Sequence, residues 1–256
     1  GNNVDAVGTV TVTGTGTSLN LSTELNVGLA GTGTLNVTNG GNILTADNVE
    51  VGGYSTAVGT INIDGVNSEI TNTANTRIGD DGTGTISLTN GAHFYADLAT
   101  YIGEAATGTG TLTLDGSGTY WENGGDFFVG YSGSGSVSVT NGADVVGDYV
   151  SFGRNLDGSA TVVVDGAGST WTNTGDLYVG EQGTADLTIS NGAEFSNVAA
   201  YIGYDTNAVG TVTVDGAGST WTNGTNVYVG EDGTGTLTIA NGGTVSIGGP
   251  ATLHLG

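Results

Sequence analysis

Acidic side chains are the residues of this sequence that come nearest to supporting chemistry, because they recur at fixed spacing. The 256 residues include 25 Asp and Glu but only two basic residues, Arg77 and Arg154. One group of aspartates lies in a repeated word, DGAGSTWTN, which begins at Asp165 and again at Asp215. Hydrolysis of a polysaccharide needs two carboxylates about 5–10 Å apart in unequal surroundings. An active site would interrupt a repeat, whereas these aspartates are part of it, so we expect no catalytic residues and no enzymatic activity.

These aspartates alternate with asparagines in what we call the turn column, in which each member precedes a glycine. Glycine supplies the positive φ that such a corner needs. With Asp at every rung, carboxylates about 4.8 Å apart would repel by about 3 kcal/mol at an effective dielectric near 20. Asn between them would place amide donors against the flanking carboxylates, so we predict a structural ladder whose alternation contributes to the two-coil repeat. The turn column comprises Asn39, Asp64, Asn90, Asp115, Asn141, Asp165, Asn191, Asp215 and Asn241.

A second acidic group, the corner acids, follows an apolar-Gly pair that recurs along the chain. Carboxylates in turns are ligands that Ca²⁺ prefers, which makes these residues weak calcium candidates. The Gly-rich nonapeptide of calcium-binding β-rolls is absent, so a solvated corner and diffuse Ca²⁺ binding along an acidic rod are the alternatives. No other cofactor is predicted. The corner acids are Asp80, Asp81, Glu104, Glu181, Asp205, Glu231 and Asp232.

An aromatic stripe occupies the position two places before many of the recurring glycines. Exposed aromatic residues in a row are typical of an interaction surface, here a carbohydrate-stacking or lateral-contact surface. Packing of rings between successive rungs is the alternative interpretation. His93 and His254 are isolated, and neither indicates a metal site. The predicted stripe comprises Tyr101, Phe128, Tyr178, Tyr201 and Tyr228.

The elements that must position these residues are short strands. Each segment of about 25 residues carries a period-2 strand, a stretch with one bulky residue such as Trp171, and a third stretch ending on an apolar-Gly pair. Ten such segments fill the chain, and long and short ones alternate. One coil cannot bury its own apolar face, so stacking must complete the core. The sequence therefore predicts an all-β fold, a single β-solenoid domain over residues 1–256 with ten coils in a two-coil repeat of about 50 residues. We favour a right-handed parallel β-helix, because the 18-residue left-handed pattern is absent.

Composition limits the partners and the compartment. A net charge of −23 argues against binding a nucleic acid through a basic patch. No apolar run approaches the ~18 residues of a membrane span, so we expect no membrane insertion. The first coil already contains the strand GTVTV, and the last ends on its glycine. An open coil exposes an unpaired strand edge, so we expect a segment of a longer array or a filament subunit that stacks head to tail on itself.

The words GTGTLTIANGG, VDGAGSTWTN and VYVGEDG resemble the repeat of bacterial autotransporter (type V secretion) passengers and of exported PEP-CTERM-associated repeat proteins. The resemblance covers essentially the whole chain and implies a secreted or surface-displayed right-handed β-helix. It implies a stalk, adhesin or matrix fibre and brings no catalytic residues with it. The expected function is therefore an extracellular structural solenoid in a filament, fibre or stalk of the bacterial cell surface. An adhesin passenger that binds host or matrix carbohydrate is the alternative, and a polysaccharide-active β-helix enzyme is the distant one.

Overall fold

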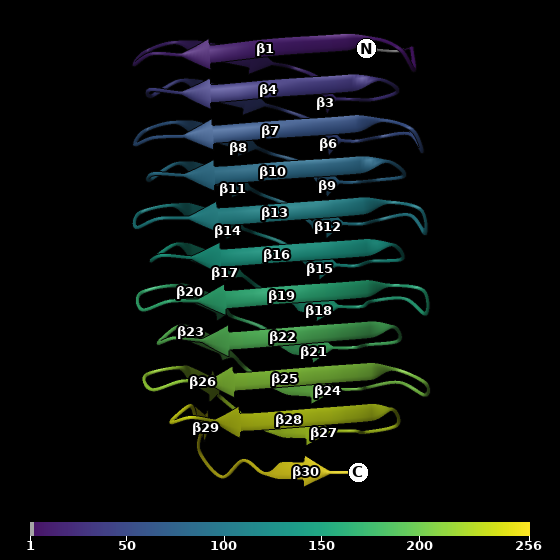
Figure 1. The fold of residues 1–256 in the computed structure, drawn as a ribbon, viewed down its shortest axis with the longest axis vertical. Coiled ribbons are helices and arrows are strands. Elements are labelled where there is room, and N and C mark those ends of the chain that lie inside the picture. Colours follow the sequence, from purple (N-terminus) through teal and green to yellow (C-terminus); the bar gives the residue numbers. More distant parts are fainter. Residues whose placement is uncertain (1–2) are drawn as a thin grey trace.

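The chain folds into a stack of coils, which the computed structural model describes for residues 3–256 (Figure 1). Each coil contributes one strand to each of three ten-stranded parallel sheets, and every strand pairs with its counterpart one coil further on. This arrangement confirms the predicted all-β solenoid and its ten coils. Among the described residues, no helix is long and apolar enough to cross a membrane.

The three sheets differ in the length of their strands. The first sheet consists of β1 (Val7–Thr13), β4 (Thr32–Thr38), β7 (Val58–Asp64), β10 (Thr83–Thr89), β13 (Thr109–Asp115), β16 (Ser134–Thr140), β19 (Ser159–Asp165), β22 (Thr184–Ser190), β25 (Val209–Asp215) and β28 (Thr234–Ala240). The second consists of β2 (Ser18–Leu21), β5 (Asn42–Thr45), β8 (Glu69–Asn72), β11 (His93–Ala96), β14 (Tyr120–Asn123), β17 (Asp144–Gly147), β20 (Thr170–Asn173), β23 (Glu194–Asn197), β26 (Thr220–Asn223) and β29 (Thr244–Ile247). The third consists of β3 (Leu25–Val27), β6 (Val49–Val51), β9 (Thr76–Ile78), β12 (Thr100–Ile102), β15 (Phe127–Val129), β18 (Val150–Phe152), β21 (Leu177–Val179), β24 (Ala200–Ile202), β27 (Val227–Val229) and β30 (Leu253–Leu255).

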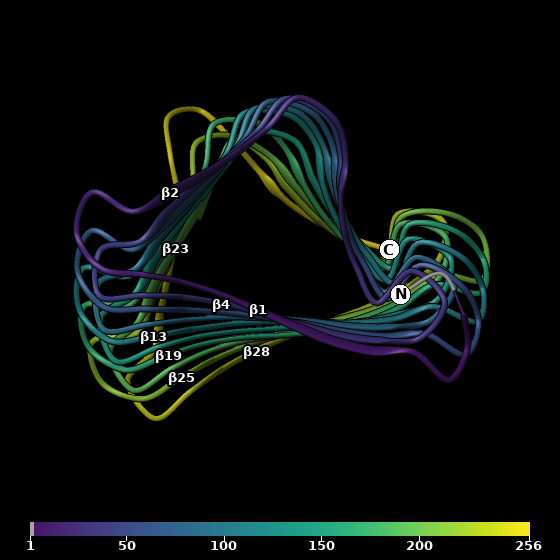
Figure 2. The same ribbon diagram turned by 90° about the horizontal axis from the view of Figure 1, so that it is seen from above.

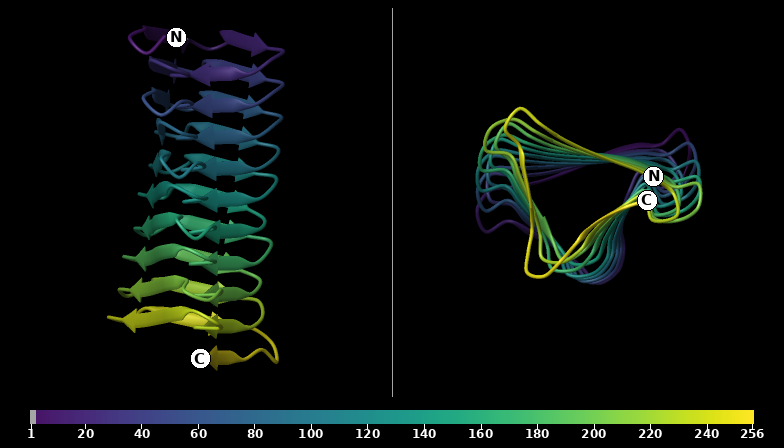
Figure 3. Two further views of the ribbon diagram at one scale, coloured as in Figure 1. Left: turned by 90° about the vertical axis from the view of Figure 1, so that its right-hand side faces the viewer. Right: turned by 90° about the horizontal axis from the view of Figure 1, so that it is seen from below.

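The coil is right-handed, as the sequence favoured. Seen from the N-terminal end, the chain runs clockwise from β1 to β2 and onward while it recedes from the viewer (Figure 2). The view from the C-terminal end shows the same triangular cross-section, with loops at its corners (Figure 3). Corner residues of successive coils therefore lie above one another, which turns each repeated position of the sequence into a column along the rod.

Alternation within the first sheet produces the core. In β13 the side chains of Leu112 and Leu114 are fully buried, whereas Thr111 and Thr113 between them lie on the outer face. The side-chain period of a strand is two, so one face must line the interior. Leu112 pairs in register with Ile86 of the preceding coil, and the neighbouring columns behave alike. Each buried aliphatic side chain contributes about 1.5–3 kcal/mol, and most of that burial depends on the adjoining coils.

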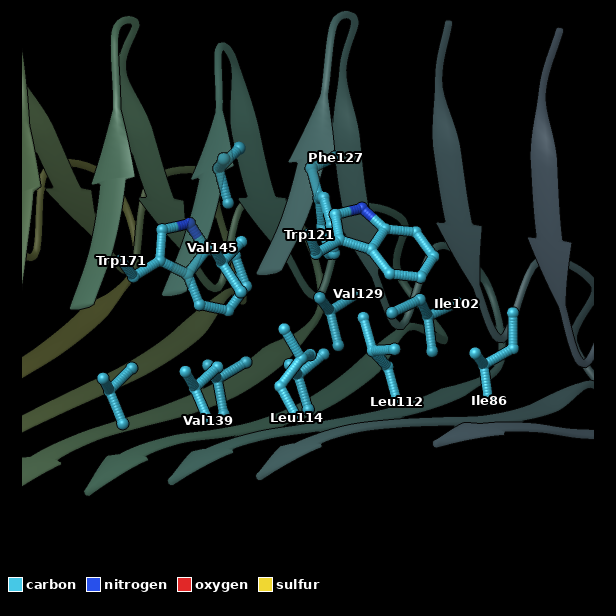
Figure 4. Close-up of a cluster of buried hydrophobic side chains, with 14 of the residues drawn as sticks. Ile86, Ile102, Leu112, Leu114, Trp121, Phe127, Val129, Val139, Val145 and Trp171 are labelled. Atoms are coloured by element: carbon cyan, nitrogen blue, oxygen red, sulfur yellow. The ribbon is translucent and has the colours of Figure 1, made fainter. Parts of the chain in front are cut away.

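The second sheet supplies the largest core side chains. Trp121 and Trp171 are fully buried and point toward the aliphatic side chains of the first sheet (Figure 4). The ring of Phe94, one coil earlier, stacks on Trp121 with centroids 4.1 Å apart and planes at 6°. The tryptophans thus belong to the core, as the sequence indicated.

A buried asparagine column lies beside the tryptophans, and sequence reasoning did not identify it. The indole N–H of Trp171 donates to Oδ1 of Asn173 at 2.7 Å. That of Trp221 donates to Oδ1 of Asn197, also at 2.7 Å, and the amide of Asn197 donates to Oδ1 of Asn223 at 2.9 Å. A buried N–H needs an acceptor, and these amides provide one inside the rod.

Candidate functional site

Aspartates of the turn column each bind the coil that follows. Oδ1 of Asp64 accepts a hydrogen bond from Oγ1 of Thr89 at 2.6 Å and another from Nδ2 of Asn90 at 2.7 Å. The two bonds stabilise the ionised carboxyl, so they hold the pKa of Asp64 below its ordinary value. Equivalent bonds join Asp115 to Thr140 and Asn141, Asp165 to Ser190 and Asn191, and Asp215 to Asn241.

From Asn90 onward the asparagines contact one carboxylate and not two, and Asn39 donates to Thr13 instead, which corrects the predicted ladder. Asn90 donates its side-chain amide to Asp64 of the preceding coil, but it meets Asp115 of the following coil with its main-chain N–H, at 3.3 Å from the Asp115 carbonyl oxygen. The backbone is the reason. Asn90 has φ +56°, and the other asparagines of the turn column also lie at positive φ, whereas none of its aspartates does. Asn tolerates this left-handed conformation better than most residues, so turn type as well as charge dictates the alternation.

A column of buried hydroxyl groups, the hydroxyl column, links each Asp turn to the turn of the preceding coil. The sequence analysis did not identify it. Oγ of Ser68 accepts a hydrogen bond at 3.0 Å from the N–H of Gly40, in the turn of the preceding coil. The same hydroxyl donates to the carbonyl oxygen of Asp64 at 2.6 Å. The signal in the sequence was the Ser or Thr four places after each Asp of the turn column. The hydroxyl column consists of Ser68, Thr119, Ser169 and Ser219, all fully buried.

Two of the corner acids form ion pairs with the two arginines of the chain. Nε of Arg77 lies 2.7 Å from Oε2 of Glu104, and Arg154 forms an ion pair with Glu181. The hydroxyl of Tyr149 donates to the other oxygen of Glu181 at 2.9 Å. These two glutamates therefore have cationic partners and are poor calcium ligands.

Of the remaining corner acids, Asp80 lies beside the Arg77–Glu104 pair and Asp81, and the others are dispersed. Burial raises the pKa of Asp80, an effect that the neighbouring Arg77 partly offsets. Asp81 accepts a hydrogen bond from the hydroxyl of Thr107. Asp205 is half-buried, and Glu231 is exposed together with Asp232. Within residues 3–256, no group of three or more His, Cys, Asp or Glu side chains could hold a metal ion.

The aromatic stripe is a stack of rings whose faces cover one another. Tyr178 and Tyr201 have centroids 4.7 Å apart with planes at 12°, and Tyr201 and Tyr228 lie 4.9 Å apart at 2°. His254 continues the stack 4.5 Å from Tyr228. A sugar stacks on an open ring face, and here neighbouring rungs occupy the faces. The geometry therefore supports cross-rung packing as the role of the stripe.

Corner tyrosines extend the stripe and close its gaps. Ser151, the member of this column between Phe128 and Tyr178, is fully buried, and the ring of Tyr149 packs against both neighbours with centroids 6.1 and 5.4 Å away. Tyr131 lies edge-on to Phe128 at 5.1 Å. Phe128 is therefore only 6% exposed, which corrects its prediction as an accessible interaction residue. Tyr204 packs edge-on against the C-terminal half of the stripe in the same way.

A second aromatic group, the β11–β14 patch, lies on the outer face of the second sheet. His93 and Tyr120 are in register on adjacent strands with centroids 6.0 Å apart, and Tyr95 lies 5.9 Å from His93. These rings meet edge to face, so they do not cover each other as the stripe does. Glu69 and Glu122 flank them, and the hydroxyl of Tyr120 donates to Glu122 at 3.3 Å. This is a place where aromatic residues interrupt outer columns that elsewhere consist largely of small polar and acidic residues.

Comparison with known proteins finds a sequence relative for about a third of the chain and a distant structural neighbour. No family model matches it. An uncharacterised lipoprotein, YdeK of Escherichia coli strain K12, is 36% identical over 91 residues, which are 35% of this chain and 7% of the lipoprotein. The chain therefore spans a small fraction of that relative's length. Among solved structures, the TibC-catalysed, hyper-glycosylated TibA fragment 55–350 aligns over 97% of this chain and 92% of that one, at 19% identity and a TM-score of 0.23.

Proposed function

We propose that this chain is a structural β-solenoid of the bacterial cell surface, a rigid rod section of a stalk or fibre. The observation that carries the proposal is the unbroken register of three sheets through ten coils. Residues that would carry chemistry in another protein are used here to join one coil to the next: the aspartates bind the following turn and the arginines bind glutamates. The acidic, lysine-free surface and the partial similarity to a lipoprotein support an extracellular setting.

We further propose that such rods join head to tail into a filament. Successive coils pair in parallel with matching registers, as β25 and β28 do from Val209–Thr234 to Asp215–Ala240. A coil of a second copy would find the same register of donors, acceptors and apolar side chains. Head-to-tail contacts of this kind do not close, so they produce fibres instead of rings.

Electron microscopy of the purified chain over a range of concentrations tests both forms. Ten coils at about 4.8 Å per strand give a rod of about 48 Å. If filaments assemble, particle lengths should be multiples of that value and should grow with concentration. The Leu255→Lys variant, changed in the last strand, should give single rods only. Single rods at every concentration would remove the filament and leave the stalk. Globular particles would contradict the rod itself. Protease shaving of intact cells, with loss of the chain from the cells, tests the location.

An adhesin is the second candidate, and the β11–β14 patch favours it. Its rings are not stacked on each other, and two carboxylates beside them could accept hydrogen bonds from sugar hydroxyls. Binding of wild-type protein to a glycan array, compared with a His93→Ala/Tyr120→Ala double variant, tests this role. A matched Tyr201→Ala variant in the aromatic stripe serves as the control and should bind as wild type does. We expect no enzymatic activity. Turnover in a polysaccharide depolymerisation screen would contradict this expectation.

A further inference from the structure

The asparagines of the turn column are each followed by glycine, which makes them prone to deamidation. In this reaction the backbone nitrogen of the glycine loses its proton and attacks Cγ of the asparagine. A C–N bond forms, the Cγ–Nδ2 bond breaks, and ammonia leaves. Water then opens the cyclic imide to aspartate or isoaspartate. Glycine offers no side chain to hinder the attack. The pairs in the turn column begin at Asn39, Asn90, Asn141, Asn191 and Asn241.

The hydroxyl column binds the attacking atom in four of these five turns. The N–H groups of Gly40, Gly91, Gly142 and Gly192 donate to Ser68, Thr119, Ser169 and Ser219, each at 3.0 Å. Every one of these hydroxyls also donates to a carbonyl oxygen in its own coil, as Ser219 does to Asp215 at 2.6 Å. That bond uses the hydroxyl proton, so the lone pairs of the oxygen are left to accept from the glycine.

We propose that each hydroxyl of this column protects the Asn-Gly pair of the preceding coil from deamidation. Attack requires the glycine nitrogen to lose its proton and to rotate toward Cγ. A hydrogen bond to a fully buried oxygen opposes both events. The leaving group is held as well, because Nδ2 of Asn191 donates to Oδ1 of Asp165 at 2.6 Å. The two coils that flank each of these asparagine turns therefore hold its two reactive atoms, the following coil the glycine nitrogen and the preceding coil the amide.

The chain contains a natural comparison at its last turn of this kind. Nδ2 of Asn241 donates to Asp215 at 2.6 Å, the same distance as Asn191 to Asp165. The N–H of Gly242 has no hydroxyl partner among residues 3–256. Asn241 thus keeps the side-chain bond and lacks the hydroxyl, so in single rods of this chain it should deamidate faster than Asn191.

Two further Asn-Gly pairs are protected by a different contact. Asn123 and Asn223 are buried, and the nitrogens of Gly124 and Gly224 donate to main-chain oxygens of the preceding coil at 2.7 and 2.9 Å. Binding of the glycine nitrogen is therefore common to every Asn-Gly pair described except the one at Asn241. An exposed rod gains lifetime from such protection, since deamidation in the turn column from Asn90 onward would set a carboxylate against an aspartate.

Peptide mapping of the whole chain after incubation in mildly alkaline buffer tests the proposal. Cleavage at glutamate releases Asn191 between Glu181 and Glu194, and it releases Asn241 after Glu231. We expect Ser219→Ala to raise deamidation at Asn191 about fivefold, the factor that corresponds to one neutral hydrogen bond in a reaction barrier. Ser219→Thr keeps the hydroxyl, as Thr119 does naturally, and should restore the wild-type rate.

The other sites distinguish protection from loosening of the fold. Asn90 retains Thr119 in the Ser219→Ala variant, so its rate should not change. An equal rise at Asn90 and Asn191 would show global loosening and overturn the proposal. So would an unchanged rate at Asn191 in a variant whose circular dichroism is that of wild type.

Discussion

Asn191→Asp should destabilise the rod, because it replaces a donor with a second carboxylate beside Asp165. The hydrogen bond that it removes, 2.6 Å from Nδ2 to Oδ1, goes to a charged acceptor, and such bonds contribute about 1.5–3 kcal/mol. Two carboxylates about 4 Å apart repel by about 1 kcal/mol in water and about 4 kcal/mol at an effective dielectric of 20. Asn191 is exposed, so the repulsion lies near the lower figure. The expected loss, the sum of the lost bond and this repulsion, is therefore about 2.5–4 kcal/mol at low salt.

Matched variants separate the charge from the backbone. Asn191→Gly removes the side-chain bond but accepts the φ of +55° without strain, so it measures the bond alone. Asn191→Ala adds the cost of the left-handed conformation, about 1–2 kcal/mol. Asp165→Asn keeps an oxygen acceptor and should cost less than either variant that lacks the donor.

Urea denaturation at low and high salt provides the measurement. At 1 M salt the Debye length falls to about 3 Å, so the penalty of Asn191→Asp should approach that of Asn191→Gly. Equal stability of Asn191→Asp and Asn191→Gly at low salt would refute repulsion as a cause of the Asp/Asn alternation. Turn type would then be its whole explanation.

Three further substitutions test the interior and the corners. Trp171→Ala should cost about 3–5 kcal/mol, measured by urea denaturation, because it opens a cavity and leaves Asn173 without its indole donor. Arg154→Met should cost about 2–3 kcal/mol by leaving the charge of Glu181 unpaired, and a Glu181→Gln change in the same protein should recover most of the loss. Burial, followed by repulsion from nearby carboxylates, raises the pKa of Glu50, so its ionisation opposes folding above that pKa. Glu50→Gln should therefore raise the melting temperature at neutral pH and lose this advantage below about pH 4.

Period-2 alternation was sufficient to predict the strands and the aliphatic core. Pairs such as Leu112 and Leu114 recur ten times. A single coil cannot bury these apolar side chains alone, so the coils must stack to form a continuous core. The bulky residue of the second stretch in each coil, such as Trp171, could be placed in the core for the same reason. These features depend on the spacing of residues along the chain and not on the conformation of any corner.

The buried polar columns could not be predicted in this way, because their burial depends on what the next coil presents. Ser68 looks like a turn residue until the N–H of Gly40 is placed over it. Tyr149 lies outside the column of the aromatic stripe in the sequence, and it joins the stripe only because its ring packs between Phe128 and Tyr178. The pairing of Arg154 with Glu181 likewise spans a corner whose path no periodicity gives. Corner conformation thus accounts for most of what the sequence left undetermined.

The contacts between coils imply that two coils, and not one, are the unit that can be removed. Deletion of residues 154–203 would bring coil six directly onto coil nine, so that Gly142 would meet Ser219 as it now meets Ser169. Both members of the Arg154–Glu181 ion pair would leave together. Deletion of residues 154–180 alone would set one asparagine turn on another, with no hydroxyl for Gly142 and no arginine for Glu181.

The longer deletion should therefore give the more stable protein, although it removes more of the core. Burial of apolar surface alone predicts the opposite order, since the shorter deletion keeps one more coil. Urea denaturation of the two deletion variants decides between these orders. A less stable protein from the longer deletion would mean that the amount of core outweighs the turn contacts, and that the two-coil repeat carries no energetic meaning.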